Sequence, residues 1–265
     1  MAQTTLQILM LGDVVGQSGL RAVTLLVPRL IKKYRADLVV MNGENADDGF
    51  GLSPENAQTM FAAGVDVITT GNHVWQHKQI RELLGNEETI IRPANYPGSP
   101  PGRGYTIRQV KGSRVAVMQL QGRVRLSNID CPFRKSRELL RSLKAEADIV
   151  LCDFHAEAAE EKESLAMYLD GSLAAIVGTH THVQTADARI LPNGTAYITD
   201  LGMTGPEGSV IGFQAETSIR RSLTQLPLKN EVHDAPGSVH GVLISIQPET
   251  GLASSITSIR ERSAI

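Results

Sequence analysis

Short apolar runs alternate with amphipathic segments along most of the chain. Residues 6–11 (LQILML), 37–42 (DLVVMN) and 65–70 (VDVITT) are apolar runs of strand length, which predicts three buried strands. Between them, residues 18–35 and 53–64 carry apolar positions at helical spacing. Because strands that alternate with helices usually pair in parallel, this order predicts a β-α-β-α-β unit with a parallel sheet.

The ends of these two predicted helices are marked to different degrees. Ser53 suits the N-cap of the second helix, Pro54 suits its first position and Gly64 suits its stop. In the first helix, Ser18 is a candidate cap, and Pro28 lies inside the pattern, where a proline can kink a helix. The second helix is therefore the better defined of the two.

The pattern changes after the turn-rich segment 96–105. Residues 105–110 and 115–122 predict two antiparallel strands joined at Lys111-Gly112. Strands from both halves of the chain predict two sheets packed together with helices outside. The other predicted elements are helices near 135–146 and 158–170 and strands at 148–154, 173–178, 196–202, 240–248 and 254–260, the last two paired.

Length and charge narrow the functional classes. The chain has 265 residues and ordinary globular composition, which fits a single α/β domain over residues 1–265. Its formal net charge of −2 argues against the basic face that a general nucleic-acid binder needs. An anionic substrate must therefore be neutralised locally, by a metal or by a few placed groups.

Cysteine usage and the N-terminal sequence predict a cytoplasmic location. The chain has two cysteines, Cys131 and Cys152, and the second lies in an apolar run, so a disulfide scaffold is not expected. The first residues lack a basic segment ahead of their short apolar run. No apolar stretch approaches the roughly 18 residues that suggest a membrane span.

Polar residues that can bind metals follow five of the predicted strands. Ligands of α/β sheets bind beyond the carboxyl ends of the strands, so these side chains are expected at one edge. In an extended chain alternate residues share a face, so both imidazoles of a His-x-His pair can reach one site. The eight candidates are Asp13, Glu44, Asn45, Asn72, His73, His155, His180 and His182.

Each candidate alone has an ordinary structural explanation. Asp13 can cap a helix, Asn45 and Asn72 suit turns, and His155 can be a hydrogen-bonded core histidine. Their recurrence at five strand ends favours a metal site. The remaining histidines contrast with this pattern: His77 is expected to be solvated, His233 to lie at the surface, and His240 either to open a strand or to line the site.

A dinucleotide-binding loop is the rival interpretation of the first strand end. Gly12, Gly16 and Gly19 follow the strand with the spacing G-x-x-x-G-x-x-G instead of G-x-G-x-x-G. Asp13 would place a carboxylate beside the pyrophosphate. Although Glu44 ends the second strand as a ribose-binding acid would, this interpretation explains none of the histidines.

Six motifs over essentially the whole length resemble the calcineurin-like metallophosphoesterases, in particular the YmdB-type branch of bacterial proteins. The resemblance implies a four-layer α/β/β/α sandwich of two mixed sheets, with metal ions at the sheet ends. The motifs are GDVVG (12–16), NGEN (42–45), TTGNHVW (69–75), DFHAEA (153–158), GTHTHVQT (178–185) and TDLGMTGP (199–206).

The chain departs from the wider superfamily at two ligand positions. The superfamily usually opens with D-x-H, but Val15 stands at the third position here, and Glu44 stands where Asp usually bridges the metals. In the YmdB-type branch Asn45 takes the place of the missing histidine. The branch implies iron, although manganese suits the same mixed ligands. The resemblance implies that Asp13, Glu44, Asn45 and His182 hold one metal and that Glu44, Asn72, His155 and His180 hold the other.

The resemblance also implies an activity. It points to a phosphodiesterase that acts on small cyclic nucleotides, 2′,3′-cyclic or 3′,5′-cyclic AMP, through a hydroxide that bridges the two metals. His73 follows the ligand Asn72 in the family pattern and is the expected catalyst that binds no metal. Thr204 either contacts substrate or belongs to a Gly-rich turn, and Trp75 either stacks on a base or, as we favour, packs internally.

Two other functions stay open from the sequence. One is a phosphomonoesterase of the same fold, such as a nucleotidase or a protein phosphatase. The other is a metal-stabilised regulatory protein that acts through a partner. A homo-oligomer is compatible with the sequence, which does not set the oligomeric state.

Overall fold

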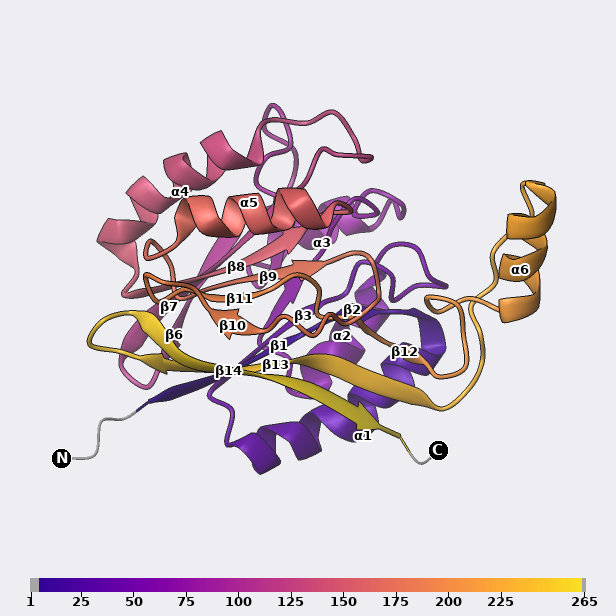
Figure 1. Ribbon diagram of the computed structural model, residues 1–265, viewed down its shortest axis with the longest axis horizontal. Coiled ribbons are helices and arrows are strands. Elements are labelled where there is room, and N and C mark those ends of the chain that lie inside the picture. The colour runs from indigo at the N-terminus through magenta and orange to yellow at the C-terminus, as the bar shows by residue number, and fades with distance from the viewer. Residues whose placement is uncertain (1–4, 264–265) are drawn as a thin grey trace.

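The computed structural model describes residues 5–263 and contains two β-sheets packed face to face (Figure 1). Within these residues, the first sheet has the strand order β2-β12-β13-β1-β3-β4-β5, with β14 paired to β13, and the second has the order β10-β11-β9-β8-β7-β6. Both sheets mix parallel and antiparallel pairs, as in β1 with β3 and β1 with β13. Two mixed sheets were predicted, and this prediction is confirmed.

The elements of the first half are β1 Leu6–Leu11, β2 Asp13–Val14, α1 Gly16–Tyr34, β3 Leu38–Asn42, α2 Pro54–Ala62, β4 Val67–Thr69, α3 Ile80–Asn86, β5 Ile90–Ile91, β6 Tyr105–Val110 and β7 Ser113–Gln121. Those of the second half are α4 Pro132–Glu146, β8 Ile149–His155, α5 Ala159–Leu169, β9 Ala175–Thr179, β10 Arg189–Ile190, β11 Ala196–Ile198, β12 Met203–Pro206, α6 Ala215–Thr224, β13 Gly237–Gln247 and β14 Leu252–Arg262.

Apolar side chains on both faces of β1 explain why this strand is a continuous apolar run. Leu6, Ile8 and Met10 belong to the core between the two sheets. Leu9 and Leu11 point the other way and belong to the core beneath α1 and α2. Since successive side chains of a strand alternate between its faces, a strand covered on both sides is apolar at nearly every position, and Gln7, which is half-buried, is the exception in β1.

Strand β8 has the same double burial in the second sheet. Ile149 and Leu151 belong to the core between the sheets, and Val150, Cys152 and Phe154 belong to the core beneath α4 and α5. Helices therefore cover the outer face of each sheet, and the layers follow the order α/β/β/α (Figure 1). The predicted four-layer sandwich is confirmed.

The ends of the first two helices test the predicted caps. Ser53 caps α2 by accepting a hydrogen bond from the Asn56 N–H at 3.3 Å, as predicted. Ser18 is not a cap: α1 begins at Gly16, and the Ser18 hydroxyl instead donates to the Ala235 carbonyl at 2.6 Å. Helix α1 continues through Pro28.

The predicted hairpin is confirmed, because β6 and β7 pair antiparallel around Lys111-Gly112, where both residues have positive φ. Strands β13 and β14 also pair as predicted.

The elements that were not predicted are short or exposed. Strands β2, β5, β10 and β12 have two to four residues, too few for a hydrophobic period.

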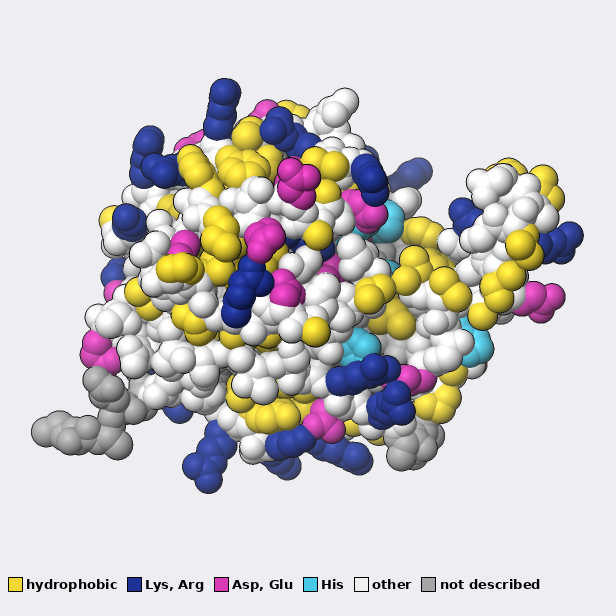
Figure 2. Space-filling view, viewed as in Figure 1, with side chains coloured by type: hydrophobic (Ala, Val, Ile, Leu, Met, Phe, Trp, Pro, Cys, Tyr) yellow, Lys and Arg dark blue, Asp and Glu magenta, His cyan; other side chains and the backbone are white. Residues whose placement is uncertain are grey.

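Helix α6 projects away from the body on an arm formed by the chain between β12 and β13 (Figure 1). None of its residues is buried. Figure 2 shows hydrophobic side chains on the surface of this arm, and they include Ile219 and Leu223. A search of residues 5–263 finds no helix with the length and apolar character needed to cross a membrane.

Candidate metal centre

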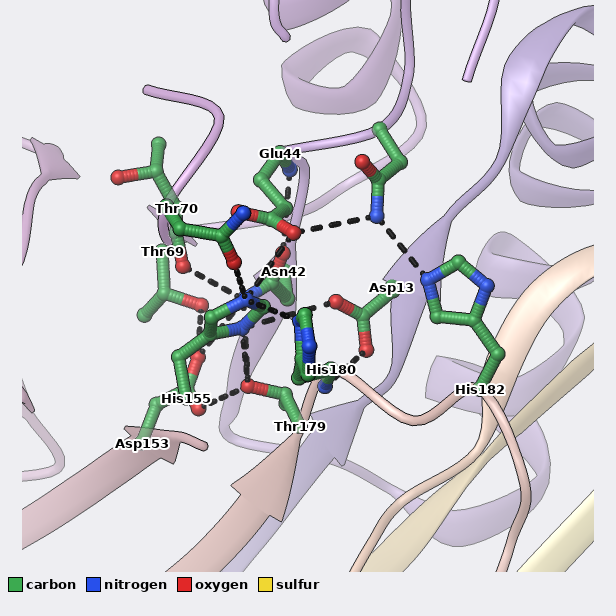
Figure 3. A network of polar contacts seen from close by, with 12 residues as sticks. Asp13, Asn42, Glu44, Thr69, Thr70, Asp153, His155, Thr179, His180 and His182 are labelled. Atoms are coloured by element: carbon green, nitrogen blue, oxygen red, sulfur yellow. Dashed lines mark hydrogen bonds and ion pairs between the residues drawn. The ribbon is translucent and has the colours of Figure 1, made fainter. Parts of the chain in front are cut away.

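All eight predicted metal-centre residues meet at one edge of the two sheets. The first sheet contributes Asp13, Glu44, Asn45, Asn72 and His73, from the segments that follow β1, β3 and β4. The second sheet contributes His155, His180 and His182, from the ends of β8 and β9 (Figure 3). The side chains touch one another across the gap between the sheets, as His155 does with Glu44 and Asn72.

The two carboxylates lie at the bottom of the centre and are completely buried. Asp13 Oδ2 accepts a hydrogen bond from the His180 N–H at 3.1 Å, whereas Asp13 Oδ1 has no hydrogen-bond partner among the described atoms and lies 3.8 Å from His155 Nδ1. Glu44 Oε1 lies 3.0 Å from His155 Nε2, and Glu44 Oε2 accepts from the His73 N–H at 3.2 Å. A buried carboxylate oxygen without a donor is costly, so Asp13 marks a place for a cation.

A chain of hydrogen bonds sets the protonation of His155. The Thr179 hydroxyl donates to Asp153 Oδ1 at 2.7 Å, so its oxygen accepts from His155 Nδ1 at 2.9 Å. Nδ1 therefore carries a proton, and Nε2 faces the centre. Fixing one imidazole nitrogen by a second hydrogen bond is the usual arrangement behind a metal-binding histidine.

His180 and His182 are oriented in the same way. His180 Nε2 lies 3.2 Å from the carboxylate of Glu157, which leaves Nδ1 facing His155 Nε2 at 3.0 Å. His182 Nδ1 donates to the Ile211 carbonyl at 2.8 Å, which leaves Nε2 facing the centre. The three histidines thus each present one nitrogen inward and hold the other with an acceptor.

The Asn45 amide lies between the carboxylates and His73. Its Nδ2 is 3.2 Å from Glu44 Oε1 and 3.0 Å from His182 Nε2, and its Oδ1 lies 2.7 Å from His73 Nδ1. In this arrangement the amide nitrogen faces the inward-facing groups, and the amide oxygen, the atom of Asn45 that can bind a metal, lies against the ring of His73, the catalyst predicted from the sequence.

The residues fit a divalent metal because several acceptor atoms converge on one point, and too few N–H or O–H donors are present to form a hydrogen bond to each of them. His155 Nε2 lies 3.0 Å from each of Glu44 Oε1, Asn72 Oδ1 and His180 Nδ1. One N–H can serve only one of these atoms, whereas a cation can serve all. Ligand atoms of Glu44, His155 and His180 all lie within 4.8 Å of one another. Imidazole, carboxylate and amide ligands together suit iron or manganese.

The pKa values of these side chains also show that the two buried carboxylates attract positive charge. Burial raises the pKa of Asp13 to about 6. Burial alone would raise the pKa of Glu44 too, but the adjacent His155 holds it well below its usual range. Burial opposes the charge on His155, yet Glu44 and Asp13 raise the pKa of His155 to about 9. Burial and the charge on His155 lower the pKa of His180 to about 3.

The backbone that carries His180 and His182 is strained. These residues have φ angles of 103° and 65°, which non-glycine residues adopt rarely. Between them, the Thr181 N–H donates to Asp200 at 3.1 Å, and Asp200 is paired at 2.7 Å with Lys162, both being buried. This buried pair holds the loop from behind. Sequence reasoning missed it, because a lysine in an amphipathic helix normally faces solvent.

A cavity of about 280 Å³ opens over the centre. Glu44, Asn45, His73, Glu157, His180 and His182 form its polar side, which we call the polar floor. The apolar part of the lining consists of Gly49, Phe50, Ile211 and Phe213, which we call the apolar wall. Sequence reasoning also missed Glu157 and the apolar wall, although Glu157 lies within the DFHAEA motif.

Thr204 and Trp75 lie outside this cavity. Thr204 is completely buried in β12, and its hydroxyl has no partner among the described atoms. Its contact with a substrate stays a prediction. Trp75 packs edge-to-face on Tyr96, with ring centroids 5.6 Å apart, and against the core beneath the helices, which agrees with the favoured internal role.

The three other histidines also lie outside the ligand cluster. His77 was predicted to be solvated, but its Nε2 lies 2.9 Å from the Phe50 carbonyl and 3.1 Å from Asp47 Oδ2. His233 is partly exposed in its loop. His240 does not line the cavity; it is buried beside Ser238, and burial lowers its pKa to about 4.

Known proteins share both the sequence and the architecture. Residues 9–259 match the family model described as YmdB-like protein. The 2′,3′-cyclic-nucleotide 2′-phosphodiesterase of Bacillus subtilis is 44% identical over 254 residues, which cover 96% of each chain. A hypothetical protein from Thermus thermophilus, known from its crystal structure, has a TM-score of 0.91 at 41% identity, covering 97% of this chain and 100% of that one.

A more distant structure, the NAD nucleotidase of Haemophilus influenzae, has a TM-score of 0.62 at 16% identity. The match covers 98% of this chain and 56% of that one, and it shows a likeness of fold alone. The family model and the Bacillus relative both extend over nearly the whole chain. The chain therefore belongs to the YmdB-like protein family.

Proposed function

We propose that this protein is a metal-dependent phosphodiesterase that hydrolyses small phosphodiesters, with 2′,3′-cyclic nucleotides as the first candidates. The observation that carries the proposal is the convergence of Glu44, His155 and His180 beneath an open cavity. The 44% identical Bacillus relative, named as a 2′,3′-cyclic-nucleotide 2′-phosphodiesterase, supports the substrate class. Hydrolysis of 3′,5′-cyclic AMP is the second candidate.

The proposed centre holds two metal ions, iron in the first place and manganese as the alternative. When bound, two divalent ions supply an activated water molecule and positive charge against the phosphoryl oxygens. The chain itself fixes the imidazoles through Thr179, Glu157 and the Ile211 carbonyl. The proposed ligands are Asp13, Glu44, Asn45 and His182 for one metal and Glu44, Asn72, His155 and His180 for the other.

His73 is the proposed catalyst that binds no metal. It lines the cavity, and its Nδ1 donates to Asn45, so Nε2 is the atom left to act on a substrate. A proton held there can be given to the alkoxide that leaves the phosphorus. Hydrogen bonds at both the backbone and the ring of His73 hold the imidazole in place, which proton transfer requires.

The charges around the cavity favour a diester over a monoester. Among residues 5–263, none of those lining the cavity is Lys or Arg. A diester carries one negative charge and a monoester close to two, so the monoester would need additional cations. A phosphomonoesterase stays the alternative, and so does a regulatory protein that acts through a partner.

Location is a further part of the proposal. Both cysteines, Cys131 and Cys152, are free thiols, which suits a reducing cytoplasm. The substrate is expected to be a small molecule and not a nucleic acid, because the formal net charge of the chain is −2 and does not indicate a basic face.

Hydrolysis of bis-p-nitrophenyl phosphate after chelation, and again after addition of Fe²⁺ or Mn²⁺, tests the function. The expected result is turnover restored by metal and lost in Glu44→Gln, with less turnover of p-nitrophenyl phosphate, the matching monoester. Tyr168→Ala, at an exposed position outside the cavity, is the control variant. Faster hydrolysis of the monoester would favour a phosphomonoesterase, and no turnover with metal bound would favour the regulatory role.

A further inference from the structure

The apolar wall is unusual for a site that must bind a phosphate. Phe50 is 39% exposed, and its ring stacks on Phe213 with centroids 5.8 Å apart and planes 27° from parallel. Phe213 is buried behind it, and Ile211 is 45% exposed beside it. Figure 2 shows hydrophobic side chains gathered next to histidines at the base of the α6 arm. A phosphate gains nothing from such a surface.

Hydrogen bonds hold the Phe50 loop in one shape. The Phe50 N–H donates to the Asp47 carbonyl at 2.8 Å, and the Asp47 N–H donates to the Gly51 carbonyl at 3.0 Å. Asp48, Gly49 and Gly51 all have positive φ, which closes the turn tightly. His77 reaches the Phe50 carbonyl at 2.9 Å from outside. The ring is therefore presented on a fixed loop, which lowers the entropy cost of binding against it.

Ile211 is held as firmly by the metal centre itself. Its φ is 48°, an outlier for a β-branched residue, and its carbonyl accepts the hydrogen bond from His182 Nδ1 at 2.8 Å. The strained backbone thus does two things at once. It fixes the imidazole of His182, and it presents the Ile211 side chain to the cavity.

The wall and the floor are in direct contact. The Phe50 ring meets His73 edge-to-face with centroids 5.2 Å apart, and His73 Nδ1 lies 3.5 Å from Glu44 Oε1. A ligand that fills the cavity therefore has its anionic part over the floor and a flat, apolar part against Phe50. Nucleotides have this combination, since every base has a π face that stacks on aromatic side chains.

We propose that the apolar wall of Phe50, Ile211 and Phe213 binds the nucleobase of the substrate, with Phe50 as the residue that stacks on it. The inference rests on the proposed function, and it makes nucleoside cyclic phosphates, not small phosphodiesters in general, the substrate class. Stacking reads the π face and not the edge of a base, so the wall accepts purines and pyrimidines alike.

The test compares 2′,3′-cyclic AMP with glycerol 1,2-cyclic phosphate, a cyclic diester that has no base. Stacking on one aromatic side chain is worth about 5- to 150-fold. We expect Phe50→Ala and Phe50→Leu to lower kcat/KM for 2′,3′-cyclic AMP by about this factor more than for the glycerol diester. Phe50→Tyr keeps the ring and is expected to restore the nucleotide rate. Tyr168→Ala removes an aromatic side chain of similar exposure outside the cavity and is the matched control.

An equal fall for both substrates, or no fall for 2′,3′-cyclic AMP, would overturn the inference. If the wild-type protein hydrolyses neither diester, the proposed function fails first. Binding of adenosine 3′-monophosphate and of glycerol 3-phosphate to the metal-loaded protein, measured by calorimetry, then decides about the wall. The expected result is tighter binding of the nucleotide, with the difference lost in Phe50→Ala. Equal affinities in the wild-type protein would contradict a base-binding wall.

Discussion

The polar floor and the apolar wall line the same cavity but are built in opposite ways. Glu44 in the floor and the proposed ligand His155 beneath it are completely buried and lie at or just after the ends of strands whose register is set by neighbouring strands. Wall residues such as Phe50 and Ile211 are exposed on loops that depend on positive φ angles. The proposed metal ligands thus lie at or shortly after the ends of sheet strands, and the wall proposed to bind the base lies on loops away from the strand ends.

This difference indicates which property each kind of substitution should change. A change in the floor alters metal binding or the chemical step for every substrate. A change in the wall alters affinity for one class of substrate and leaves the metals in place.

His73 belongs to the floor, where its ring donates a hydrogen bond to Asn45, and it also packs against Phe50 in the wall. If it is the catalyst that binds no metal, His73→Ala lowers kcat by about 10²- to 10⁴-fold for nucleotide and base-free diesters alike. Metal content, measured by elemental analysis, is expected to stay unchanged. Metal loss in step with activity would show that His73 belongs to the ligand set. His233→Ala, a partly exposed histidine outside the cavity, is the control.

The buried Lys162–Asp200 pair supports the floor from behind, because Asp200 accepts from the Thr181 N–H between the two strained histidines. Lys162→Met leaves Asp200 buried without its partner, and the loss of such a partner costs about 3–5 kcal/mol of unfolding free energy. We also expect metal affinity to fall by about 10- to 100-fold, as for other residues behind metal ligands.

Denaturant unfolding and metal titration of Lys162→Met measure these two effects. The double variant Lys162→Met/Asp200→Asn removes both charges and is expected to recover part of the stability. Lys135→Met, from an exposed ion pair with Glu138, should change stability by less than about 1 kcal/mol. Unchanged metal affinity in Lys162→Met would show that the pair serves the fold alone.

The same contrast explains what the sequence could predict. The metal-centre residues beneath and within the floor were predictable, because Asp13, Glu44, Asn72 and His155 each follow a run of apolar residues and the ends of strands meet at a known edge. The four-layer fold followed from the same runs and from the family resemblance. Both rest on patterns that are local in the chain.

The wall was not predictable, because Phe50 and Phe213 are far apart in sequence and meet only through loop geometry. Trp75, the aromatic residue nearest to the catalytic motif, packs inside instead. Ser18 failed as a cap because the chain near Ala235, more than 200 residues away, accepts its hydrogen bond. Positive φ at Ile211, a β-branched residue, likewise has no signal in composition or periodicity.

His77 gives the smallest and most selective test of the wall. Its imidazole holds the Phe50 carbonyl and touches no residue of the floor in the described contacts. His77→Ala removes one hydrogen bond, so kcat/KM for 2′,3′-cyclic AMP should fall by about 2- to 10-fold. The base-free diester should be affected less, and metal content should not change. His77→Gln keeps an N–H donor and is expected to recover most of the loss. Since the loop acts only by positioning Phe50, His77→Ala should add little to Phe50→Ala in the double variant, and full additivity would show that the loop and the ring act independently.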